Sequence, residues 1–139
     1  MEGFFETKHG VVAWNDELQS VMMEWNGFAY GEEFQTILMK GAELLHKKKG
    51  SKVLMDTRNG AAIKAEDKAW IGEIFVKKAY ESGLRQIALV QPRSVVAKLS
   101  INRTVEGLGT LPYLQENFSD WDEAVNWLSA SSPKLQVIG

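Results

Sequence analysis

The sequence contains no cysteine, three prolines and two histidines among its 139 residues. The absence of cysteine excludes disulfide bonds, thiolate nucleophiles and cysteine-ligated zinc. His9 and His46 lie far apart and lack the His-Glu-x-x-His spacing of a zinc-binding helix, so we expect no metal site. No serine stands in a Gly-x-Ser-x-Gly elbow, and no pair of a nucleophile and a base is apparent. We therefore expect no enzymatic activity and no cofactor.

Long apolar runs are also absent, and none approaches the roughly 20 residues that a membrane-spanning helix requires. The first ten residues carry Glu2, Glu6, Lys8 and His9 and have no apolar core of signal-peptide length. We therefore expect a cytoplasmic protein without integral membrane association. The reducing cytoplasm is compatible with a chain that has no cysteine.

The chain has no excess of charge of one sign, because 16 Lys and Arg residues face 18 Asp and Glu residues. A net charge of -2 creates no field that would attract nucleic acid, so we expect no nucleic-acid partner. The hydrophobic content of 45% and the length are typical of one globular domain. We predict a single domain over residues 1–139, with a core of about residues 10–129 and a loose carboxyl-terminal tail.

Two short apolar runs, at residues 53–55 and 87–90, are the strongest structural signal that is present. Unbroken apolar runs of this length are typical of strands that are buried on both faces of a central α/β sheet. The predicted strands are 11–14, 18–25, 52–57, 85–91 and 112–118, and the predicted helices are 32–49, 65–82, 94–106 and one from 119 onward. This order predicts an α/β fold with a mixed, mostly parallel five-stranded sheet and about four helices. The sequence does not decide which edge of the sheet the amino-terminal hairpin joins.

Several local motifs accompany this order of elements. They are Glu24-Trp25-Asn26-Gly27-Phe28, Asp56-Thr57-Arg58-Asn59, Gly83-Leu84-Arg85 after a helix that carries a tryptophan, and Trp121-Asp122-Glu123-Ala124-Val125-Asn126-Trp127-Leu128. From about Gly10 to Ser129 the chain resembles the SpoIIAA-like superfamily, in particular its small stand-alone bacterial members. That superfamily contains the STAS domains of anti-sigma-factor antagonists and, more distantly, the CRAL-TRIO lipid carriers. The resemblance implies a STAS-like fold and a non-enzymatic regulatory role.

The chain departs from the phosphorylated members of that superfamily at one position. Those members carry an acceptor serine where the helix after the third strand begins, but residues 63–67 here are Ile-Lys-Ala-Glu-Asp and contain no hydroxyl group. The phosphorylation switch is therefore not carried over. Glu66 and Asp67 either imitate the charge of a phosphate or stabilise the dipole of their own helix as first-turn carboxylates.

Polar side chains follow the two buried strands, at the edge where open α/β sheets bind their ligands. The candidate binding residues are Asp56, Thr57, Arg58, Asn59, Arg93 and Ser94. Two arginines near a helix start suit an anion such as a phosphate or a lipid headgroup. The alternative is that these residues only form turns and cap the next helix.

The residue pattern of the predicted helix over residues 65–82 indicates a second candidate site, a protein interface. A helical wheel places Ile71, Phe75, Val76, Ala79 and Tyr80 toward the core and places Trp70 and Ile74 on the opposite, charged side. An apolar pair within a charged rim is typical of a small protein interface. The alternatives are that another segment covers the pair or that the helix is rotated relative to the wheel.

Two functions follow from these features. The first is a non-enzymatic protein-interaction or regulatory module that binds a protein partner or a second copy of itself as a homodimer. The alternative is a binder of a small apolar, lipid-like or anionic ligand at the carboxyl ends of the parallel strands. A core of this size would not enclose a whole lipid and stay packed.

Overall fold

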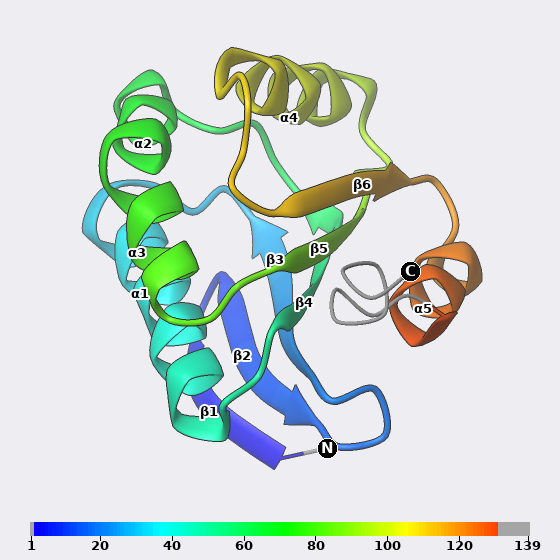
Figure 1. The fold of residues 1–139 in the computed structure, drawn as a ribbon. Helices are drawn as coiled ribbons and strands as arrows, with labels where there is room; N and C mark the ends of the chain where they lie inside the picture. The colour runs from blue at the N-terminus through cyan, green and yellow to red at the C-terminus, as the bar shows by residue number, and fades with distance from the viewer. Residues whose placement is uncertain (1, 131–139) are drawn as a thin grey trace.

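The computed structural model describes residues 2–130 (Figure 1). The strands are β1 (Glu2–Thr7), β2 (Gly10–Asn15), β3 (Ser20–Gly27), β4 (Lys52–Gly60), β5 (Gln86–Val90) and β6 (Leu114–Phe118). The helices are α1 (Gly31–Lys48), α2 (Ala65–Trp70), the π-helical turn η1 (Ile71–Phe75), α3 (Val76–Glu81), α4 (Val95–Gly107) and α5 (Trp121–Ala130). Because α2, η1 and α3 follow one another without a break, they form one rod, the α2–α3 helix. The tail predicted to be loose lies outside the described residues.

The strands form one sheet in the order β1-β2-β3-β4-β5-β6. The pairs β1–β2 and β2–β3 are antiparallel, whereas β3–β4, β4–β5 and β5–β6 are parallel. The predicted mixed, mostly parallel α/β sheet is therefore confirmed. The amino-terminal hairpin joins the sheet through β3, which lies beside β4, and this pairing settles the strand order that the sequence left open.

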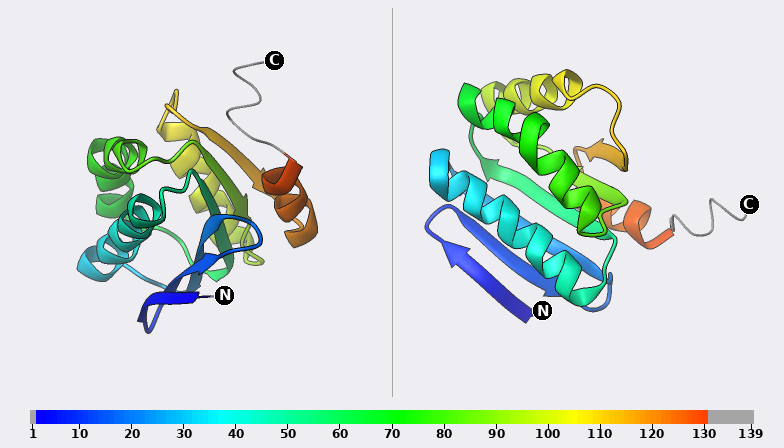
Figure 2. Two further views of the ribbon diagram at one scale, coloured as in Figure 1. Left: turned by 60° about the horizontal axis from the view of Figure 1, so that its bottom comes forward. Right: turned by 60° about the vertical axis from the view of Figure 1, so that its left-hand side comes forward.

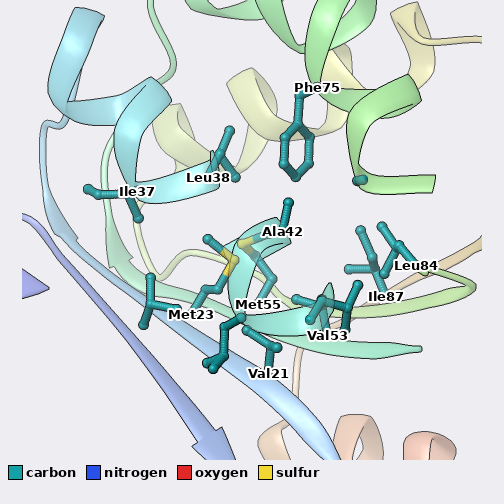
Figure 3. Close-up of a cluster of buried hydrophobic side chains, with 14 of the residues drawn as sticks. Val21, Met23, Ile37, Leu38, Ala42, Val53, Met55, Phe75, Leu84 and Ile87 are labelled. Atoms are coloured by element: carbon teal, nitrogen blue, oxygen red, sulfur yellow. The ribbon is translucent and has the colours of Figure 1, made fainter. Parts of the chain in front are cut away.

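Helices cover both faces of the sheet (Figures 1 and 2). On one face, α1 and the α2–α3 helix lie side by side and α4 lies beyond them, whereas α5 covers the other face. The predicted central strands are confirmed, since Val53, Leu54 and Met55 are all buried, as is every residue of β5. Their side chains alternate: Val53 and Met55 join the larger core (Figure 3), whereas Leu54 packs on the opposite face with Ala124 and Leu128 of α5.

The prediction of five strands is wrong, because β1 adds a sixth strand at the edge beside β2. Its burial is slight, and its register shifts between Gly3 and Phe5, so it shows no strong strand pattern. Lysines of α1 stabilise it from a distance in the sequence: the ammonium group of Lys47 lies 5.6 Å from the ring centroid of Phe4, and that of Lys40 lies 5.6 Å from that of Phe5.

The π-helical turn corrects the helical wheel of the α2–α3 helix. A π-turn widens one turn of the helix, so the side chains before it and those after it no longer share the positions of a single wheel. Trp70, before the turn, packs partly against the core, whereas Tyr80, after it, which the wheel placed inward, is 40% exposed. Ile74 is exposed as predicted, at 49%. Gly83 ends the helix, as the sequence predicts, and Leu84 beyond it is fully buried.

We expect Gly83→Ala to lower the free energy of unfolding by about 1 to 3 kcal/mol. Gly83 has a φ of 114°, and a Cβ there would lie 2.8 Å from the carbonyl oxygen of Gly50, which belongs to the backbone and cannot rotate away. Denaturation with urea measures the change. The matched control is Gly107→Ala in α4, where a Cβ meets no atom within 4 Å. A Gly83→Ala protein as stable as this control would contradict the prediction.

Candidate functional site

An apolar pocket of about 100 Å³ lies between the sheet and the helices α1, η1 and α4. The sheet contributes Trp25, Met55 and Leu89, and α4 contributes Ile101 and Val105. The pocket lies over one face of the sheet and extends from the carboxyl-terminal half of β4 across β5 to the amino-terminal end of β6. None of the side chains that line it is charged.

Small residues at the end of β4 leave this space open. Gly60, Ala61 and Ala62 border the pocket, and Ile63 follows them. A Cβ on Gly60 would approach the carbonyl oxygen of Thr57 to 3.2 Å, so the chain turns tightly at this point. The backbone of Ile63 donates a hydrogen bond to Ser100 Oγ at 3.0 Å, and this bond attaches the segment to α4.

The aromatic wall of the pocket is held by side-chain contacts. The indole nitrogen of Trp25 donates to Met55 Sδ at 2.9 Å, and its ring lies 5.2 Å from that of Phe34 on α1. Two residues from different strands and one from a helix therefore position each other. Such mutual packing makes the wall rigid rather than collapsible.

Besides the indole N–H of Trp25, the polar side-chain groups in the lining are three hydroxyls and one amide. Thr57 donates its hydroxyl hydrogen to the carbonyl oxygen of Val90, and Thr104 donates to that of Ser100 at 2.8 Å. Tyr113, immediately before β6, is 8% exposed, and burial raises its pKa to about 12. Within residues 2–130 its hydroxyl has no hydrogen-bond partner. The amide belongs to Gln115, which is half-buried.

The structure brings the six predicted binding residues to one end of the sheet but divides them between its two faces. Arg58 Nε and Nη2 donate to the two carboxylate oxygens of Asp56, each at 3.0 Å. The guanidinium also lies 4.7 Å from the ring centroid of Trp121 on α5. The hydrogen bond to Asp56 raises the pKa of Arg58 above its ordinary value. Thr57 points the other way, into the pocket.

The remaining three residues connect β4 to α4. Arg93 Nη1 donates to Asn59 Oδ1 at 2.6 Å. Ser94 caps α4, because its Oγ accepts a hydrogen bond from the backbone nitrogen of Ala97 at 3.3 Å, as its sequence position indicated. The two guanidinium groups thus have partners within the chain, and anion binding at this edge stays a prediction.

Asp67, one of the two first-turn carboxylates, has a role that the sequence did not reveal. It is 1% exposed, and its Oδ2 accepts a hydrogen bond from the backbone nitrogen of Gly31 at 2.9 Å. It therefore satisfies the amino terminus of α1, a different helix from its own. Glu66 beside it is exposed. No pattern of neighbouring residues could have signalled a contact across 36 positions.

Trp70 and Ile74 lie apart from the pocket. Trp70 borders a groove of about 510 Å³ between α1 and the α2–α3 helix, together with Met39 and His46. Its ring stacks on that of Phe75 at 6.0 Å. The structure thus supports the alternative that the helix is rotated relative to the wheel, and an interface at Trp70 and Ile74 stays a prediction.

The other titratable cluster joins the β1–β2 turn to α1. His9 Nδ1 lies 2.8 Å from Glu33 Oε1, and Thr7 donates to Glu33 Oε2 at 2.7 Å. These hydrogen bonds hold the pKa of Glu33 below its ordinary value. Across residues 2–130, no three His, Asp or Glu side chains come together as metal ligands. In the same range, no helix has the length and apolar character needed to cross a membrane.

These features define an open α/β sheet with helices on both faces and an apolar pocket between one face and its helices. Among solved structures, the chain is similar to an uncharacterized protein of the DUF3478 family from Shewanella loihica PV-4, which has a SpoIIAA-like fold. The TM-score is 0.58 at 13% identity, and the match covers 91% of this chain and 99% of that one. The chain therefore has the SpoIIAA-like fold, as its motifs predicted. No protein-family model and no curated protein matches the sequence.

The anion hypothesis predicts that phosphate stabilises the wild-type protein, because Arg58 keeps N–H groups to spare beside its contact with Asp56. At ten times the Kd, phosphate would add about 1.4 kcal/mol to the free energy of unfolding, and Arg58→Ala would remove most of that gain. Thermal unfolding in phosphate and in chloride of equal ionic strength measures it. Identical melting temperatures in both salts would exclude the anion site.

Proposed function

We propose that this chain is a non-enzymatic binding module that takes a small apolar ligand, or the apolar end of a larger one, in the pocket between the sheet and α4. The observation that carries this proposal is the pocket itself, which is bordered by 21 residues without one charged side chain. Apolar lining with few polar groups is typical of small-molecule sites.

The size of the pocket limits the ligand. An apolar cavity of roughly 150 Å³ in another protein holds benzene. At about 100 Å³ and partly open, this pocket suits one ring or the end of an alkyl chain. A whole lipid would have to leave most of its length outside.

The absence of acid and base groups from the lining supports binding without catalysis. Proton abstraction from a bound molecule requires a basic side chain such as His, Asp, Glu or Lys within hydrogen-bond reach, and none of these residue types borders the pocket. Tyr113 does border it, but burial raises its pKa to about 12, so it is no base at neutral pH. The hydroxyls of Thr57 and Thr104 are directed to backbone carbonyl groups and have no base beside them in the lining.

We expect ethylbenzene to shift the NMR signals of the pocket methyl groups of Ile63, Val105 and Leu108, and Ala62→Phe to abolish the shifts by filling the space. The matched control is Ala69→Phe, because Ala69 is exposed on α2. Circular dichroism checks that both variants fold. If ethylbenzene leaves the wild-type methyl signals unchanged, or binds Ala62→Phe as well as Ala69→Phe, the proposal is wrong.

A second candidate is the protein-contact role that the fold resemblance implies, and the outer face of α4 favours it. Val95, Val96 and Leu99 are 72%, 70% and 50% exposed. Lys98 and Arg103 are exposed on the same helix, closer to these apolar residues in the sequence than the exposed Glu106. An apolar centre flanked by cations suits a partner segment that presents apolar and acidic side chains.

For this second candidate, we expect a labelled amphipathic peptide with a leucine face and glutamate flanks to bind the protein, with its affinity falling as salt rises. Leu99→Ser should weaken binding by about tenfold, which corresponds to the loss of one well-placed apolar contact. Fluorescence anisotropy measures the affinity. Leu114→Ser is the control, since Leu114 is 44% exposed on β6, outside α4. Equal affinity in both variants would argue against α4 as the contact face.

A further inference from the structure

We propose that the hydroxyl group of Tyr113 selects the ligand of the pocket by donating a hydrogen bond to an uncharged oxygen, such as that of a ketone, aldehyde or ether. The inference rests on the proposed function and names the class of ligand. It would make the pocket prefer a carbonyl-bearing ring over a hydrocarbon of the same shape.

Among the side-chain hydrogen-bond donors of the lining, Tyr113 is the most buried one whose hydrogen is not used within residues 2–130. The indole of Trp25 donates to Met55, and the amide of Gln115 is only half-buried. A hydroxyl group has one hydrogen to donate. Thr57 and Thr104 give theirs to the carbonyl groups of Val90 and Ser100. Tyr113 borders the pocket and is 8% exposed, and across residues 2–130 its hydroxyl meets no hydrogen-bond partner. A ligand oxygen would satisfy this donor.

A ligand that fills the pocket would make such a bond valuable. It would displace water from the Tyr113 hydroxyl, and a polar group that loses its hydrogen bonds to water without gaining a partner raises the free energy of the complex. An acceptor on the ligand would restore one of them in a largely apolar setting. The same reasoning gives selectivity, since a hydrocarbon ligand would leave the hydroxyl unpaired.

The charge state of the pocket narrows the class to neutral ligands. Burial raises the pKa of Tyr113 to about 12, so the phenol keeps its proton at neutral pH and acts as a donor. No Lys, Arg or His borders the pocket to balance a carboxylate or a phosphate. An ionised group would therefore lose its hydration without gaining a counter-charge.

Acetophenone and α-methylstyrene test the inference, because they differ mainly in a C=O group that replaces C=CH₂. We expect Tyr113→Phe to weaken acetophenone binding by about threefold to tenfold and to leave α-methylstyrene binding within about twofold, as the loss of one hydrogen bond requires. NMR titration of the pocket methyl groups gives both dissociation constants. Tyr80→Phe is the matched control, since Tyr80 is 40% exposed and does not border the pocket.

The possible outcomes distinguish the pocket proposal from the assignment of Tyr113. If both compounds bind and Tyr113→Phe weakens both equally or neither, the assignment of Tyr113 is overturned and the pocket proposal stands. If neither compound binds the wild-type protein, the pocket proposal fails and the inference fails with it. Selective weakening of acetophenone in Tyr113→Phe, but not in Tyr80→Phe, supports both.

Discussion

Strands β4 and β5 lie in the middle of the sheet with apolar side chains on both faces. The arrangement of the helices depends on the burial of these side chains. Val53 and Ile87 need cover on one side and Leu54 and Ala88 on the other. A strand with two apolar faces is stable only between two layers. Helices α1, α2–α3 and α4 supply one layer and α5 the other, so the placement of the helices follows from the two central strands.

The pocket exists because this packing is incomplete at one end. α1 and the α2–α3 helix lie along the sheet, whereas α4 buries only Ala97, Ile101 and Thr104 of its 13 residues. Small residues after β4 do not fill the space between α4 and the sheet. The same helix thus borders the apolar pocket with its inner side and exposes Val95 and Val96 on its outer side. A ligand in the pocket would contact the helix that carries the exposed apolar patch.

The sequence predicted the parts of this fold that depend on local patterns. The apolar runs identified β4 and β5, and Ser94 and Gly83 marked helix ends correctly, because capping and termination use neighbouring backbone groups. The sequence did not predict the features that depend on residues far apart in the chain or on a change of helical period. β1 pairs with β2 and has lysines of α1 over its phenylalanine rings, and the π-turn between Trp70 and Tyr80 sets these two side chains at an angle that an ordinary helix does not give.

The sequence by itself determined the fold class, the central strands and the lack of cysteine chemistry, because periodicity and composition are properties of nearby residues. Only the tertiary structure decided that Asp67 binds the amino terminus of α1 and that the guanidinium of Arg58 lies over the ring of Trp121 on α5. It also decided that Tyr113 borders an uncharged pocket. These contacts join residues of separate elements, and their distances depend on how the helices pack against the sheet.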